Sequence, residues 1–165
     1  ALSPQFQDAA KLVADYRSLH PEATPPQVCL EILTLATMGR GARRVNEAQL
    51  QAGGPPVYSY LLDWATPIEG GRLGTPHALD VPLVFDNVAE GISMYGEGAG
   101  QAQKLADYMS AAWAAFARTG APNAAGLPDW PAYEDAGRTA MVIDTPSAAR
   151  AGVLVAEHAL LDRHQ

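Results

Sequence analysis

Apolar residues recur every three to four positions along the first fifty residues, a spacing typical of amphipathic helices. Residues 5–20 predict a helix that ends at Pro21, and residues 26–38 predict a second, more apolar and more buried helix punctuated by glycines. Residues 42–52 predict a third helix, which stops at Gly53. The apolar face of the first helix contains Leu12, Val13, Tyr16 and Leu19.

The pattern then changes to that of a strand. Residues 57–64 are rich in β-branched and aromatic side chains and are apolar almost throughout. Such a run predicts a central strand that is covered on both faces. Glycine and proline recur through residues 65–76, which predicts a loop, and His77 follows that loop directly.

The clearest helix covers residues 99–118, where apolar residues follow the i, i+3, i+4, i+7 spacing. Residues 141–143 predict a short strand, and residues 148–162 predict a last helix. Because helices bracket two strands that lie far apart in the sequence, we expect an α/β fold. Sheets usually contain about 4–6 strands, so these two strands must join others supplied elsewhere.

The charge of the chain indicates which classes of binding partner are to be expected. The 165 residues carry a net charge of −7, and the largest basic cluster is the pair Arg43-Arg44. We therefore expect neither nucleic acid nor a membrane as a partner. The chain has no signal or transmembrane stretch, and it opens at Ala1 without an initiator Met, which suggests a processed or truncated piece.

Few side chains offer metal or thiol chemistry. Cys29 lies in an apolar run, where burial as a small hydrophobic residue is favoured over a reactive thiol. His20, His158 and His164 have no metal-ligand spacing with a carboxylate or with Cys29, and no metal is expected. The three tryptophans are interpreted as core residues, and no phosphate loop or dinucleotide motif is present.

His77 is the candidate of greatest interest. Ligands bind beyond the carboxyl ends of strands in open α/β sheets, so a histidine after a central strand is well placed for catalysis. A neutral imidazole can take a proton from a hydroxyl group and later return it. If residues 77–81 form one helical turn, Asp80 shares a face with His77. The alternative is a structural or solvent-exposed histidine.

Ser93 is a weaker candidate for a nucleophile. The segment 91–96 superficially suggests the Gly-x-Ser-x-Gly elbow of serine hydrolases. Its second glycine comes one residue late, and the serine does not follow a predicted strand. We therefore interpret this segment as a flexible loop, and the chain contains no credible nucleophile motif.

Residues 74–85, with the sequence GTPHALDVPLVF, closely resemble the histidine segment of the type-B carboxylesterases. This α/β-hydrolase family includes the para-nitrobenzyl esterases and the cholinesterases, and it usually shows Gly-x-x-His-[Ala/Gly]-x-Glu-[Leu/Ile]-x-Phe-Val-Phe there. The resemblance continues in order through residues 16–17, 21–25, 56–60, 113–123, 127–133 and 139–144. The chain departs from the pattern at Asp80, where Glu is usual, at Leu83, where Phe is common, and at Asp86, where Gly is common.

The resemblance implies that residues 1–165 are the C-terminal segment of a single α/β-hydrolase domain. Its fold would be a mixed central sheet flanked by helices, incomplete without an N-terminal part. The whole protein would be a serine esterase that hydrolyses carboxylic esters through an acyl-serine intermediate. His77 falls on the catalytic histidine, and Asp80 keeps a carboxylate that could support it.

The same resemblance places the serine nucleophile, the acid and the oxyanion hole upstream of this chain. The expected partners are the N-terminal portion of the same esterase and a small-molecule ester, with no cofactor, and the chain alone is expected to be inactive. The alternative is a non-catalytic, cholinesterase-like binding module in which His77 is a relic. The compartment stays open between cytoplasm and secretion, with the cytoplasm slightly favoured.

Overall fold

The computed structural model describes residues 6–124, 126–134 and 136–164. The chain divides into two compact units, one formed by residues 1–53 with 152–165 and the other by residues 54–151. Of the helices in the described ranges, none combines the length and the apolarity needed to cross a bilayer.

The first unit begins with helix α1, Ala9–Leu19. Asp8 caps this helix, because its carboxylate accepts a hydrogen bond of 2.9 Å from the backbone N–H of Lys11. Leu12 and Tyr16 are buried as the apolar face predicts, whereas Leu19 is largely exposed. The helix ends before Pro21, as expected.

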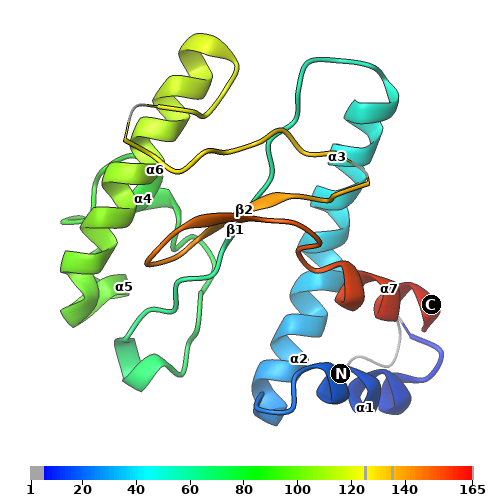
Figure 1. The fold of residues 1–165 in the computed structure, drawn as a ribbon. Coiled ribbons are helices and arrows are strands. Elements are labelled where there is room, and N and C mark those ends of the chain that lie inside the picture. Colours follow the sequence, from blue (N-terminus) through cyan, green and yellow to red (C-terminus); the bar gives the residue numbers. More distant parts are fainter. Residues whose placement is uncertain (1–5, 125, 135, 165) are drawn as a thin grey trace. The chain divides into compact units, whose positions relative to one another are not determined.

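One long helix follows, shown in blue to cyan in Figure 1. It is formed by α2 (Pro25–Thr34), a π-helical turn η1 (Leu35–Gly39) and α3 (Arg40–Gln51). The expectation of a break between residues 38 and 42 is therefore wrong. Gly39 adopts ordinary helical angles (φ −60°, ψ −42°). A glycine inside a helix costs only about 1 kcal/mol, which packing of the helix offsets.

The burial expected for residues 26–38 is also wrong in part. Val28 and Ile32 are buried, but Leu30 is 60% exposed and Met38 is 70% exposed. Cys29 is half-buried rather than buried. The spacing of apolar residues predicts a helix, but it does not show which of the apolar side chains will pack against another part of the protein.

Helix α7 (Val155–Arg163) completes the first unit and packs against α1. It starts later than the expected residue 148, because residues 148–150 pair with a neighbouring strand and Gly152 (φ +70°) turns the chain. The core of the unit contains Phe6, Leu12, Tyr16, Val28, Ile32, Leu35, Leu160 and Leu161.

The second unit holds a mixed three-stranded sheet in the order β1-β2-β3, with β1 at Tyr60–Leu62, β2 at Ala140–Ile143 and β3 at Ala148–Arg150. β1 runs parallel to β2, with Tyr60 opposite Met141, and β3 runs antiparallel to β2. β1 is shorter than the expected 57–64 and lies at an edge of the described sheet rather than in its centre. β2 matches its prediction and is buried throughout.

Helices cover this sheet. The longest is α6 (Ala99–Thr119), which matches the predicted range 99–118 and ends at Gly120 in the left-handed conformation (Figure 1). Shorter helices are η2 (Ile68–Gly71), α4 (Val81–Val84), α5 (Ile92–Tyr95) and η3 (Gly96–Gly98). The core joins α6 to the sheet and to the loop after β1, and it includes Trp64, Leu79, Leu83, Tyr95, Leu105, Met109, Trp130, Met141 and Ile143. Trp64 and Trp130 are core residues as expected, and Trp113 is partly buried against them.

Candidate active site

The loop that carries His77 leaves the sheet at the carboxyl end of β1. The backbone N–H groups of Asp63 and Trp64 both donate to the carbonyl of Ile143, at 3.0 and 3.2 Å. The indole N–H of Trp64 donates to Gln101 on α6 at 3.0 Å. The start of the loop is therefore tied to both β2 and α6.

The loop closes on itself just before His77. The N–H of Thr66 donates to the carbonyl of Gly74 at 2.9 Å, and the hydroxyl of Thr75 donates to the carbonyl of Trp64 at 3.0 Å. The hydroxyl of Thr66, which is buried, donates to the carbonyl of Met94 at 2.6 Å. These bonds bring Gly74 and Thr75, which directly precede Pro76 and His77, back to the residues that follow β1.

His77 opens a turn over residues 77–80, and its side chain is exposed. The N–H of Leu79 donates to the carbonyl of Pro76, and the N–H of Val81 donates to the carbonyl of Ala78, each at 3.2 Å. Within the ranges that the structure describes, the imidazole makes no hydrogen bond or ion pair. The residue is exposed to solvent in the described structure.

The helical turn considered for residues 77–81 does not form. Ala78 has φ 66°, which is left-handed, and α4 begins only at Val81. Asp80 instead accepts a hydrogen bond of 2.9 Å from the hydroxyl of Tyr60 on β1. The supporting role expected of Asp80 therefore does not act through a direct bond to His77.

The turn is also held by contacts with the core of the second unit. Leu79 is buried in the core, and the hydroxyl of Tyr95 donates to its carbonyl at 2.9 Å. Burial, together with the charge of Asp80, raises the pKa of Tyr95 to about 12. Burial and the hydrogen bond to Asp80 raise the pKa of Tyr60 to about 12 as well. Both phenols therefore remain protonated donors at neutral pH.

Sequence reasoning did not identify Tyr60 or Tyr95 as part of this site. Tyr60 lies 20 residues before Asp80, and Tyr95 lies 16 residues after Leu79. No local spacing rule links residues so far apart. The only sequence signal was the aromatic content of the strand, which indicates a sheet and not a hydrogen-bond donor.

Ser93 lies exposed in α5, and the residues before it form turns rather than a strand. It therefore lacks the strand–turn–helix setting of a nucleophile elbow. This agrees with the interpretation of the sequence, although the segment forms a short helix and not a loop.

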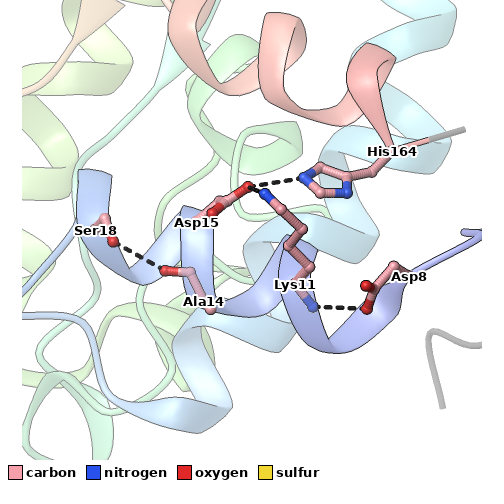
Figure 2. A network of polar contacts seen from close by, with 6 residues as sticks. All are labelled: Asp8, Lys11, Ala14, Asp15, Ser18 and His164. Atoms are coloured by element: carbon pink, nitrogen blue, oxygen red, sulfur yellow. Dashed lines mark hydrogen bonds and ion pairs between the residues drawn. The ribbon is translucent and has the colours of Figure 1, made fainter.

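The other three histidines belong to the first unit, and two of them, His20 and His164, contact carboxylates. His164 lies 2.9 Å from Asp15, which also binds Lys11 at 2.7 Å (Figure 2). His20 lies 3.0 Å from Glu157, and His158 is buried. No group of three or more potential metal ligands occurs in the described part of the chain.

Two concave regions lie in the second unit, and His77 lines neither of them. One, of about 620 Å³, is lined by α6, residues 126–128 and residues 144–147. The other, of about 180 Å³, is formed by aromatic rings of β1, α6 and Trp130. Tyr60 is one of the residues that line the smaller region.

Comparison with known proteins gives a consistent result along the chain. A family model described as "Carboxylesterase family" matches residues 9–159. The fumonisin B1 esterase of Sphingopyxis macrogoltabida is 33% identical over 110 residues, which cover 58% of this chain and 20% of that protein. Liver carboxylesterase B-1 of Rattus norvegicus is 35% identical over 94 residues, which cover 54% of this chain and 16% of that protein.

Solved structures agree with these sequence matches. A Geobacillus stearothermophilus carboxylesterase superposes with a TM-score of 0.80 at 30% identity, covering 97% of this chain and 33% of that chain. A thermophilic PNB esterase gives a TM-score of 0.70 at 25% identity, covering 97% of this chain and 32% of that chain. The chain thus spans about a fifth of the length of the first curated relative and about a third of these structures.

Proposed function

The chain belongs to the carboxylesterase family, with an α/β-hydrolase fold, and on that premise we propose that it supplies the catalytic histidine of a carboxylic ester hydrolase. The observation that carries the proposal is the position of His77. It is an exposed imidazole on a closed loop at the carboxyl end of a parallel strand, inside the segment that the family matches. Ligands of open α/β sheets bind at this edge.

His77 would act as a general base and then as a general acid. It takes the proton of a serine hydroxyl while the serine oxygen attacks the ester carbonyl, and it returns that proton to the departing alcohol. It next takes a proton from water, whose oxygen attacks the acyl-serine, and it gives that proton back to the serine oxygen. Each cycle leaves one acid, one alcohol and an unchanged enzyme.

The remaining groups of the reaction are proposed to lie in a preceding part of the same enzyme. They are the serine nucleophile, the acid that orients His77 and the oxyanion hole. Ser93 does not fit the nucleophile because it lacks the elbow. The length of the relatives, of which this chain covers a fifth to a third, is consistent with such a division. The proposed substrate is a small-molecule carboxylic ester, as the membership of the carboxylesterase family suggests.

The experiment uses the complete protein that contains this chain. His77→Ala is expected to lower the turnover of a carboxylic ester about a thousandfold or more, because members of a triad act as a unit. Ser93→Ala is the control, and turnover should stay within about a factor of two because Ser93 is exposed and lacks the setting of a nucleophile. Near-normal turnover in His77→Ala would contradict the assignment.

A serine-directed phosphonate separates the esterase from a binding module without a triad. The complete protein should react with the phosphonate and become inactive, whereas residues 1–165 alone should neither react nor hydrolyse esters. If the complete protein neither reacts with the phosphonate nor hydrolyses esters, it is a binding module. Robust hydrolysis by residues 1–165 alone would contradict the proposal that the serine, the acid and the oxyanion hole lie in a preceding part of the enzyme.

A further inference from the structure

The hydrogen bond between Tyr60 and Asp80 joins the sheet to the turn that carries His77. The phenol oxygen lies 2.9 Å from one carboxylate oxygen of Asp80, across 20 residues of sequence. Asp80 is half-buried and ends the turn, three residues after His77. A hydrogen bond that a neutral donor makes to a carboxylate is stronger than one between neutral groups.

Apart from the buried side chain of Leu79, the described structure gives the turn few other hydrogen bonds to the rest of the unit. Its bonds from Leu79 to Pro76 and from Val81 to Ala78 are local and do not fix its position. Beyond these, Tyr95 holds the carbonyl of Leu79, and no bond holds the His77 ring in the described ranges. Within this chain the direction of the imidazole therefore depends on the backbone of the turn, and Tyr60 and Tyr95 both make hydrogen bonds to that turn.

The phenol of Tyr60 is itself held in place. Its ring contacts Trp113 edge-on, with centroids 5.0 Å apart, and it contacts Trp130 at 6.4 Å. The indole N–H of Trp130 donates to the carbonyl of Ser59, the residue before Tyr60, at 3.1 Å. Since aromatic pairs of this geometry are attractive, the strand presents the hydroxyl in a defined direction.

We propose that Tyr60 is a positioning residue for the esterase reaction, acting through Asp80 to hold the turn of residues 77–80 so that His77 points at the nucleophile. The inference rests on the proposed function. It also gives Asp80 a defined task, as the acceptor of Tyr60 and not as a partner of the imidazole. A misplacement of about 1 Å in a catalytic group can cost about a hundredfold in rate, so the bond affects turnover rather than substrate binding.

The test compares Tyr60→Phe, Asp80→Ala and the double variant in the complete enzyme. Each single variant should lower kcat about tenfold and leave KM within about a factor of two, the size expected for losing one charge-assisted hydrogen bond. The double variant should be no slower than the slower single variant, because both changes remove the same bond. Asp80→Asn keeps an acceptor oxygen and should retain more turnover than Asp80→Ala.

Tyr58→Phe is the matched control. Tyr58 lies two residues before Tyr60, and its hydroxyl makes no hydrogen bond in the described ranges, so kcat should not change. Titration of active sites with the phosphonate corrects every rate for the amount of folded enzyme. If Tyr60→Phe then equals the wild type, or if the two single effects multiply in the double variant, the positioning role is wrong. Turnover that survives His77→Ala would instead refute the proposed function itself.

Discussion

The side chain of His77 is exposed, whereas the three residues that follow it are held in place by their neighbours. The imidazole is open to solvent, while the next three residues are held by a left-handed angle at Ala78, the buried side chain of Leu79 and the bonded carboxylate of Asp80. The position of His77 after a loop was predictable from Gly74 and Pro76. The pairing of Asp80 was not, because a side-chain hydrogen bond between distant residues depends on how the strand and the turn meet.

Ala78 allows a test of strain at this turn. A Cβ atom in the left-handed region costs about 1–2 kcal/mol, whereas glycine adopts it freely. Ala78→Gly should therefore raise the free energy of unfolding by up to about 1 kcal/mol, and Ala78→Val should lower it by more than about 1 kcal/mol, because β-branched residues are rare at positive φ. Urea denaturation of the complete enzyme measures both.

Ala114 provides the control with the opposite sign. It is exposed in the middle of α6, where the backbone is helical. Ala114→Gly should lower the free energy of unfolding by about 1 kcal/mol, as glycine does in a helix interior. If Ala78→Gly destabilises the protein as much as Ala114→Gly does, the left-handed angle at residue 78 stores no strain.

The helices and strands match their predicted bounds where the local preference of the sequence and the tertiary packing favour the same structure. Helix α6 covers Ala99–Thr119, close to the predicted range 99–118, and it ends at Gly120 because glycine adopts the left-handed angle of a helix end without cost. Gly39 and Gly41 suggested a break, yet the helix from Pro25 to Gln51 continues through them. The strand before His77 is shorter than its apolar run, because only Tyr60, Leu61 and Leu62 pair in register with β2.

The start of α6 lies against the loop that leads to His77, and Gly98 makes this approach possible. A Cβ atom at residue 98 would lie 2.7 Å from the ring of Pro67, closer than such atoms tolerate, and 3.1 Å from Trp64, which is a tight contact. Gly98→Ala should therefore displace the rigid ring of Pro67 and lower the free energy of unfolding by about 1–3 kcal/mol.

Gly100 is two residues further along and serves as the comparison. A Cβ atom there would meet nothing within 4 Å, and the residue lies inside α6. Gly100→Ala should raise the free energy of unfolding by about 0.5–1 kcal/mol. Thermal or urea unfolding of the two variants gives the comparison, and equal effects would show that residue 98 does not limit the approach of the loop.

The molecule as a whole is acidic, and two of its carboxylates are stabilised in the ionised form. Hydrogen bonds from Lys11 and His164 hold the pKa of Asp15 below its ordinary value of 3.8 (Figure 2). Burial alone would raise the pKa of Asp162, but the bonds and charge of Arg43, with Arg40, outweigh burial and lower it. Arg43 lies 3.0 Å from Asp162, which belongs to α7, and His164 follows that helix directly.

Because of these contacts, we expect the local stability of α7 to fall at acidic pH. A carboxyl group whose pKa is lowered by folding stabilises the folded state above its ordinary value, and that contribution is lost as the pH falls below about 4. Hydrogen exchange of the α7 amides should therefore accelerate from about pH 4 downward, and the Asp15→Asn and Asp162→Asn variants should depend less on pH there. Asp129→Asn, which changes an exposed residue of the second unit, should match the wild type. If Asp15→Asn and Asp162→Asn show the same pH dependence of hydrogen exchange in α7 as the wild type, the prediction is wrong.

The sequence alone determined the family resemblance, the α/β class, the histidine loop, the long helix α6 and the buried strand β2. These features depend on motifs and on the periodicity of neighbouring residues, which are local properties of a chain. Only the tertiary structure decided that α2 and α3 form one helix, that residues 148–150 form a strand, and that Asp80 bonds to Tyr60 and not to His77. Those outcomes depend on which distant groups meet, because pairing between strands and side-chain hydrogen bonds can outweigh local preference.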